Sequence, residues 1–283
     1  MKLNTVNLGL GGGTLLQIAN RSPHQMMSYL IDTPNGNVIM IDGGYCCNED
    51  SNNLYKLLSD RGKCVDYWFI THAHSDHLGA LLNLLEMDNF DIDIKHLCFH
   101  FPCREWLLKM EGAQINERFF NAVNKHKITV VTPNAGDCFE CGGVAVNVLN
   151  EPRNYQSYPS INPTSIILLV KFPANKVLFL GDFDVFGQDD YVKNFDVSKL
   201  KCDIVQMAHH GQQGVDRAFY EYIEPKICLY TAPKWLWENN CYMCDNPETA
   251  GKGPFTIMET RQWMKEMGVK ADYTIADGDY MFR

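Results

Sequence analysis

Long hydrophobic runs are missing from this sequence. No window of its 283 residues approaches the roughly eighteen uninterrupted apolar residues that a membrane-spanning helix needs. Residues 1–7 contain a lysine but no apolar stretch of the kind found in a secretory signal. We therefore expect a cytoplasmic protein that does not span a membrane.

A surplus of positive charge is missing as well. The chain has 25 lysines and arginines against 34 aspartates and glutamates, a formal net charge of −9, and no basic run forms a stripe. Proteins that bind long DNA or RNA need such a stripe to displace counterions from the phosphates. We therefore expect no extended nucleic acid as a partner. A small phosphoester remains compatible with this charge, because a bound metal ion supplies positive charge of its own.

Motifs for covalent catalysis and for nucleotide binding are also absent. The sequence contains no Gly-x-Ser-x-Gly elbow to carry a serine nucleophile. The glycines within residues 9–13 lack the Lys-Ser/Thr pair of a phosphate-binding loop, and Thr14 stands where a Gly-x-Gly-x-x-Gly pattern needs its last glycine. These glycines indicate a flexible turn, and direct attack by water is the expected route for any hydrolysis.

Cysteine, in contrast, is abundant, with 11 residues. The odd number and the absence of an export signal predict reduced, mostly buried thiols. Two Cys-x-x-Cys pairs, Cys138 with Cys141 and Cys241 with Cys244, leave a second interpretation open, in which four thiolates share one structural zinc ion. The long separation of the pairs favours reduced thiols.

The order of apolar segments predicts the fold class. Short apolar runs bounded by turn residues predict strands near the N-terminus, as in the hairpin signal Pro34-Asn-Gly36. Strands and amphipathic helices then alternate, and this order recurs in the second half. No linker rich in serine or glycine divides the chain. We expect one α/β domain over residues 1–283, with two sheets covered by helices.

A group of potential metal ligands follows one predicted strand. The apolar run Tyr67–Ile70 ends in His72, His74, Asp76 and His77, and an apolar pattern at helical spacing comes next. Imidazole and carboxylate together suit zinc, and they also suit iron or manganese. The alternative, a solvated turn that happens to be rich in histidine, is disfavoured by four such side chains within six residues.

Two further predicted strands end in ligand-type residues. Asp182 directly follows Val177–Gly181, and His209 and His210 follow the run that starts at Ile204. The carboxyl ends of strands gather at one edge of a sheet and form a crevice for ligands. We therefore expect these residues to meet the first group, with Asp182 as a carboxylate that bridges two cations.

These motifs together resemble the metallo-β-lactamase superfamily. The similar elements are His72-x-His74-x-Asp76-His77, Leu180-Gly-Asp182 and His209-His210-Gly211, with the upstream Met40-Ile-Asp42-Gly-Gly44. Within the superfamily, the chain resembles the branch of the nuclease-like domain of DNA-uptake channels and the choline-phosphate esterases. The resemblance implies an αββα four-layer sandwich of two mixed β-sheets flanked by helices.

The resemblance also implies a binuclear site for two divalent metal ions, with zinc favoured and manganese or iron as alternatives. One metal ion would take His72, His74 and Asp182, and the other would take Asp76, His77, Asp182 and His209. By the same resemblance His209 is preferred to His210 as a ligand. His210 is then a candidate catalytic residue, as a proton donor or phosphate contact, or else makes a plain structural hydrogen bond. Asp76 is the other candidate catalytic residue, because it would both bind metal and orient the attacking water. Many relatives supply one more histidine from the loop at 149–165. This loop contains none, which leaves Glu151, Asn162 or water to fill the place.

The leading hypothesis is therefore a metal-dependent hydrolase of phosphodiester or related ester substrates, with small molecules or phosphoesters as partners. Two alternatives remain at this point. An iron-dependent oxidoreductase of the same fold would use His72, His74 and Asp182 as a two-histidine, one-carboxylate set. A non-catalytic metal-binding protein would follow from an incomplete first site. Asp42 is either a partner that orients a ligand imidazole or a plain turn residue.

Overall fold

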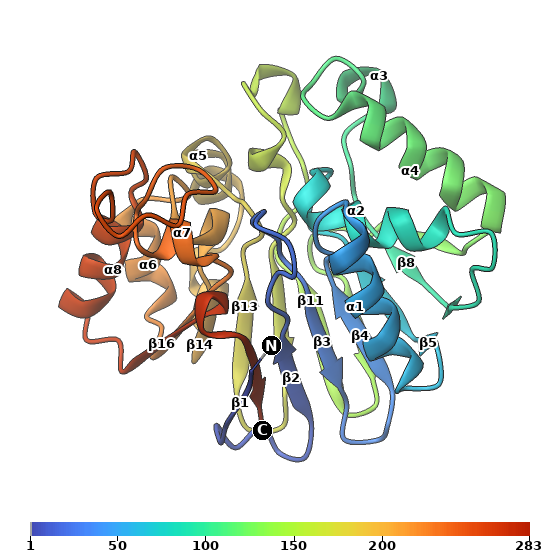
Figure 1. Cartoon of the computed structure of the whole chain (residues 1–283), viewed down its shortest axis with the longest axis horizontal. Helices are drawn as coiled ribbons and strands as arrows, with labels where there is room; N and C mark the ends of the chain where they lie inside the picture. The colour runs from blue at the N-terminus through green and yellow to red at the C-terminus, as the bar shows by residue number, and fades with distance from the viewer. Residues whose placement is uncertain (1) are drawn as a thin grey trace.

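Two β-sheets packed face to face form the middle of the molecule, and helices cover the outer face of each (Figure 1). The computed structural model describes residues 2–283. The arrangement is the αββα sandwich that the resemblance implied. The two ends of the chain lie close together, because the strand that contains Val6 pairs with the strand that contains Phe282.

The first sheet has eight strands, in the order β1-β17-β2-β3-β4-β6-β8-β9. Their bounds in chain order are β1 Leu3–Val6, β2 Thr14–Gln17, β3 Tyr29–Asp32, β4 Val38–Ile41, β6 Tyr67–Phe69, β8 Leu97–Cys98, β9 Val130–Val131 and β17 Asp279–Phe282. A separate pair, β5 Cys64–Val65 and β7 Asp93–Ile94, lies beside it and was not predicted.

The second sheet has seven strands, in the order β10-β11-β12-β13-β14-β15-β16. Their bounds are β10 Cys138–Cys141, β11 Val144–Val148, β12 Leu168–Lys171, β13 Lys176–Phe179, β14 Ile204–Gln206, β15 Ile227–Tyr230 and β16 Ala271–Thr274. From β13 to β16 neighbouring strands are parallel, so their carboxyl ends meet at one edge.

The helices divide between the two faces. Those that cover the first sheet are α1 Asn48–Ser59, α2 Ser75–Leu85, α3 Arg104–Leu107 and α4 Ala113–His126. Those on the side of the second sheet are α5 Val185–Asn194, α6 Arg217–Ile223, α7 Lys234–Trp237 and α8 Ile257–Glu266. None of the helices in the described part of the chain is long and apolar enough to cross a membrane.

The alternation of side chains along the strands explains the layers. In β3, Tyr29 and Ile31 point into the core between the sheets, whereas Leu30 packs in the core under the helices of the first sheet. In β12, Leu168 lies between the sheets and Leu169 lies on the outer side. Both faces of these strands are buried, because successive side chains of a strand point to opposite faces and both faces are covered here.

The segment with His209 and His210 differs from the prediction. The sequence suggested a strand that runs into the two histidines, but β14 ends at Gln206. Both histidines then adopt left-handed backbone, with φ of 49° and 59°. Side chains in this tight turn do not point alternately to opposite faces as they would in a strand. The turn therefore determines which of the two imidazoles faces the site.

The cysteine prediction was partly wrong. Nine cysteines are free thiols as expected, but Cys241 and Cys244 form a disulfide in the loop after α7. The shared zinc site is not formed either: among the described residues, the groups of side chains that could hold a metal ion contain no cysteine. Cys138 is exposed on an edge strand, whereas Cys141 is buried.

The close approach of α2 to the segment after β4 requires a glycine at position 79. A Cβ atom there would collide with the backbone of Cys46. We expect Gly79→Ala to lower the free energy of unfolding by about 1–3 kcal/mol, the usual cost of overpacking. This cost exceeds the gain that alanine gives over glycine in helix propensity. Urea unfolding measures this change. The matched control is Asn52→Ala on the exposed face of α1, which should leave stability nearly unchanged. Equal stability of the two variants would contradict the tight contact.

Candidate metal centre

Three segments at the carboxyl ends of strands position the candidate ligands. His72 and His74 lie in the loop between β6 and α2, and Asp76 and His77 occupy the first turn of α2. Asp182 follows β13. Gly181, which precedes it, has a φ of 57°, and a Cβ there would lie 2.8 Å from the hydroxyl of Thr71.

The structure brings these residues into two groups that share one carboxylate. The first group contains His72, His74 and Asp182, and the second contains Asp76, His77, Asp182 and His210. Within each group the candidate ligand atoms lie within 4.8 Å of one another. The sequence prediction that Asp182 stands between two sets of ligands therefore agrees with the geometry.

Distances from the Asp182 carboxylate show how closely the groups are joined. Its Oδ1 lies 3.0 Å from His77 Nε2. Its Oδ2 lies 3.5 Å from His210 Nε2 and 3.9 Å from His72 Nε2. In the first group His72 Nε2 is 3.0 Å from His74 Nδ1, and in the second His210 Nε2 is 3.2 Å from Asp76 Oδ2. Such spacings suit atoms that surround a common cation, because zinc binds nitrogen and oxygen at about 2.0–2.2 Å.

Each imidazole uses its other nitrogen to contact an oxygen outside the groups. His77 Nδ1 donates to Asp42 Oδ2 at 2.6 Å, and His74 Nε2 donates to Glu111 at 3.1 Å. His210 Nδ1 lies 3.1 Å from the Thr231 carbonyl and His72 Nδ1 lies 3.2 Å from the Thr71 hydroxyl. These contacts fix the tautomers, since the nitrogen that donates must carry the proton. The opposite nitrogen of each ring is then free to bind a metal ion.

Asp42 organises the floor of the site. Its buried carboxylate accepts hydrogen bonds from the Thr71 backbone at 2.7 Å, from the Thr71 hydroxyl at 2.8 Å and from His77. The left-handed backbone at Asp42, with φ of 57°, turns this side chain back toward the end of β6. Of the two interpretations that the sequence allowed, the geometry favours a residue that orients a ligand imidazole.

Two polar atoms in the second group have no hydrogen-bond partner. His77 Nε2 and Asp182 Oδ1 are buried and form an ion pair at 3.0 Å, and neither atom makes a hydrogen bond to another described residue. A cation bound by both atoms would take the place of this ion pair. The donors present therefore fit a metal ion.

The electrostatics agree with this fit. Burial lowers the pKa of His77, but Asp182, Asp42 and Asp76 outweigh burial and hold it well above its usual range. In the same way Asp182 and Asp76 overcome burial and raise the pKa of His210 to about 9. Burial raises the pKa of Asp182, but the surrounding histidines bring it well below its ordinary value. The site thus contains buried carboxylates that favour positive charge beside them.

The geometry reverses the assignment that the resemblance implied: His210, and not His209, lies among the candidate ligands. His210 is fully buried and belongs to the second group. His209 is partly exposed at the rim, outside both groups, with its Nε2 3.8 Å from Asp182 Oδ2 and 3.5 Å from Asn162 Nδ2. The turn at these two residues is the cause, because it directs the second imidazole inward.

Two contacts were not found from the sequence. Glu111, in the segment between α3 and α4, accepts from His74 and from the backbone of Ile161, and the His74 contact lowers its pKa to about 2. Gln25 donates to Asp76 Oδ2 at 3.0 Å and accepts from Gln212. Neither residue stands in a recognisable pattern, so the sequence carried no signal for them.

The two suggested substitutes for the missing histidine lie in different places. Asn162 reaches the rim beside His209, and its buried Oδ1 has no hydrogen-bond partner. Glu151 accepts from the backbone of Ala135 and pairs with Arg153, so its contacts lie elsewhere. The four remaining histidines also make contacts outside the two groups: His24, His96, His100 and His126.

Comparison with known proteins gives the family. A model described as the metallo-beta-lactamase superfamily matches residues 21–224, more than half of the chain. The chain belongs to the metallo-beta-lactamase superfamily. A protein of Cupriavidus necator described as a metal-dependent hydrolase is 44% identical over 62 residues, which cover 22% of this superfamily member and 21% of that protein.

Two solved structures have the same fold at low identity. CmlA from Streptomyces venezuelae, described as a diiron beta-hydroxylase, superposes with a TM-score of 0.59 at 15% identity, over 92% of this chain and 52% of CmlA. Unliganded yeast PDE1 superposes with a TM-score of 0.53 at 12% identity, over 95% of this chain and 98% of PDE1. This superfamily member thus spans about half of CmlA and nearly all of PDE1.

The role of Asp42 can be tested by removing its charge. We expect Asp42→Asn to weaken metal binding by about 10–100-fold, because the amide no longer holds His77 with a charged acceptor. Competition with a chromophoric chelator measures the affinity. Asp189→Asn, on an exposed residue of α5, is the matched control and should bind metal as the original protein does. Unchanged affinity in the Asp42 variant would contradict the assigned role.

Proposed function

We propose that this metallo-beta-lactamase superfamily member is a metal-dependent hydrolase of phosphodiesters or related esters. The observation that carries the proposal is the buried carboxylate of Asp182 between two sets of ligand atoms. These sets would hold two divalent metal ions, for which zinc is the favoured metal. His72, His74 and Asp182 would hold one ion, and Asp76, His77, Asp182 and His210 would hold the other.

The proposed ligand set differs from the sequence prediction at one position. His210 replaces His209, because its Nδ1 faces the Thr231 carbonyl and its Nε2 faces Asp76 and Asp182. With both nitrogens engaged, His210 has no free proton for a substrate, so we no longer assign it the role of a proton donor. His209 at the rim is better placed for contact with a substrate, beside Asn162.

Divalent cations at such a site supply Lewis acidity and lower the pKa of water, which is the chemistry that ester hydrolysis needs. The protein contributes orientation. Asp42, Glu111 and the Thr231 carbonyl hold the imidazoles of His77, His74 and His210, and Gln25 holds Asp76. Because these contacts are made by the protein's own side chains and backbone, the ligand atoms are arranged before any ion binds.

The fold by itself is compatible with more than one chemistry, as the names of CmlA and PDE1 illustrate. One feature supports hydrolysis over mono-iron chemistry. The second group adds three ligands to the two-histidine, one-carboxylate set that a mono-iron oxygenase needs. Metal analysis separates the cases: two zinc or manganese ions per chain support hydrolysis, and iron alone would contradict it.

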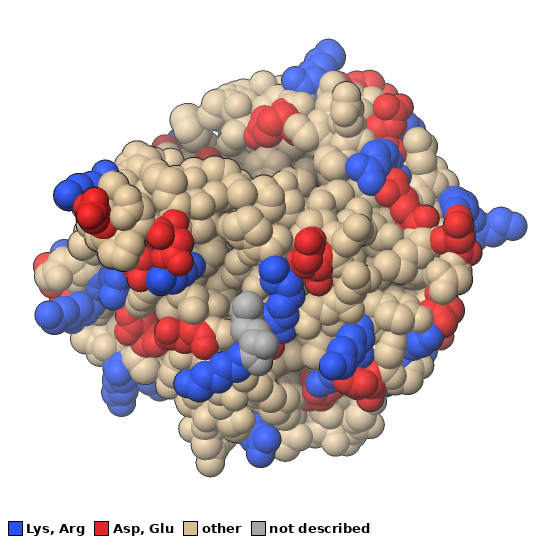
Figure 2. Space-filling view, in the orientation of Figure 1, with Lys and Arg blue, Asp and Glu red and all other residues tan. Residues whose placement is uncertain are grey.

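The charge of the protein supports small phosphoesters as the proposed substrate class. Lysine, arginine and acidic residues alternate over the face shown in Figure 2, and no stripe of one sign crosses it. With a net charge of −9, small phosphoesters suit this protein better than extended nucleic acid.

Removal of the shared carboxylate tests the proposed activity. Asp182→Ala should abolish hydrolysis of bis(p-nitrophenyl) phosphate and lower the metal content, because both groups lose a ligand. Absorbance of the released nitrophenolate and elemental analysis measure the two effects. The control Asp189→Ala should keep both properties. Full activity in the Asp182 variant would rule out the proposed site.

The choice between the two adjacent histidines gives a sharper test. His210→Ala should lose about one metal ion per chain, because the second group then lacks an imidazole. His209→Ala should keep the full metal content and change mainly the KM for the substrate. Elemental analysis of both purified variants, folded as judged by circular dichroism, measures the difference. The reverse pattern would restore the ligand set that the resemblance implied.

A further inference from the structure

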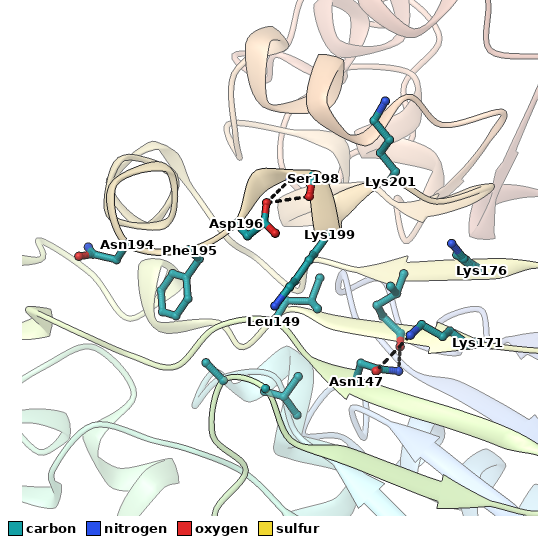
Figure 3. A pocket seen from close by; sticks show the side chains of 14 residues that line it. Asn147, Leu149, Lys171, Lys176, Asn194, Phe195, Asp196, Ser198, Lys199 and Lys201 are labelled. Atoms are coloured by element: carbon teal, nitrogen blue, oxygen red, sulfur yellow. Dashed lines mark hydrogen bonds between the residues drawn. The ribbon is translucent and has the colours of Figure 1, made fainter.

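A pocket on the outer face of the second sheet is separate from the metal centre. It has a volume of about 680 Å³, within the range of small-molecule sites. Strands β11, β12 and β13 form its floor, and the segment after α5 forms one wall (Figure 3). Lys176 begins β13 and Asp182 follows its end, so at most roughly 20 Å of chain separates this lysine from the metal centre.

The floor of the pocket is apolar. Leu149 and Leu169 line it, and Phe195 lies beside Leu149 on the wall in Figure 3. The two leucines belong to the apolar core on this side of the sheet and keep only 8% and 5% of their surface exposed. They therefore offer a small apolar surface at the bottom of the pocket to the apolar part of a ligand.

The lining of the pocket contains more positive than negative charge. Four lysines line the pocket: Lys171, Lys176, Lys199 and Lys201. Lys201 pairs with Glu224 at 2.7 Å. The other three form no ion pair within residues 2–283, and Lys171 only donates to the neutral Asn147. In Figure 3, Lys171 and Lys176 lie on the side opposite Phe195, and Lys199 lies between Phe195 and these two lysines.

The lining contains one acidic residue, Asp196, which offsets part of this charge because it lies near Lys199. Both the backbone and the hydroxyl of Ser198 donate to its carboxylate, at 3.0 and 2.7 Å, so it caps the turn that follows α5. Outside the lining, Asp203 lies near Lys176 and accepts from its backbone. Four lysines against one lining aspartate still give the pocket a positive charge, in a chain whose net charge is −9. Unpaired lysines that converge on a pocket favour an anion, and their point charges suit phosphate and carboxylate groups.

We propose that this pocket is a second binding site, for a small organic anion. The phosphate, phosphonate or carboxylate group would lie between Lys176 and Lys199, and an apolar body would lie on Leu149, Leu169 and Phe195. The site is independent of the proposed hydrolysis, because none of its residues belongs to the metal centre.

Calorimetric titration of the full, metal-loaded chain with phenylphosphonate tests the proposal. This probe has an apolar ring, a dianionic head and a carbon–phosphorus bond that ester hydrolysis does not break. We expect saturable binding at one site that depends on the lysines. Lys176→Glu with Lys199→Glu should weaken it about tenfold or more, because charge-assisted contacts are replaced by repulsion.

The matched control carries the same change in net charge elsewhere. Lys56→Glu with Lys270→Glu, two exposed lysines outside the pocket, should bind within about twofold of the original protein. Equal weakening in both double variants would overturn the proposal, because it would show a general charge effect. No weakening in the pocket variant would also overturn it, since binding would then lie at the metal centre. If the charge-reversed protein fails to fold, Lys176→Gln with Lys199→Gln replaces it.

Methylphosphonate tests the apolar floor without any mutation. It carries the same anionic head as phenylphosphonate but no ring, so it should bind at least about fivefold more weakly if the ring is buried against the leucines. Equal affinities would overturn the amphipathic character of the site. Absence of saturable binding by either probe at millimolar concentration would overturn the site as a whole.

Discussion

The position of one buried carboxylate governs the organisation of the candidate site. Asp182 lies between two sets of imidazoles, and its Oδ1 has no hydrogen bond in the protein. Charges of this kind are removed from water only when opposite charge compensates them closely. The histidines supply part of this compensation, and a cation supplies the rest. Strand β13 and the left-handed Gly181 after it fix the carboxylate at this place.

The ligands depend in turn on contacts that extend outward from the site. Asp42, Glu111 and Thr231 each hold the far nitrogen of one imidazole. These partners come from the end of β4, from the segment before α4 and from the end of β15, so both sheets contribute. The sandwich is therefore more than a support for the loops. It sets the tautomer of each histidine by bringing an oxygen acceptor to one side of the ring.

The two ends of the second sheet have different chemical character. At the carboxyl ends of β13 and β14, carboxylates and imidazoles gather into a centre that favours cations. On the outer face near the start of β13, lysines surround an apolar recess that favours anions. One sheet can carry both, because residues at opposite ends of a strand are too far apart for their charges to cancel in salt solution.

Local sequence was enough for the family, the layered fold and most of the ligand-type residues. His72, His74, Asp76 and His77 stand within one short motif, where spacing alone limits their arrangement. Other features depended on contacts between distant segments. Two consecutive left-handed residues turned His210 rather than His209 inward, and Glu111 reached His74 from the segment between α3 and α4. The disulfide at Cys241 and Cys244 likewise required a loop conformation that Cys-x-x-Cys spacing leaves undetermined. Sequence patterns report which residues are near in the chain, whereas backbone turns and packing decide which side chains meet.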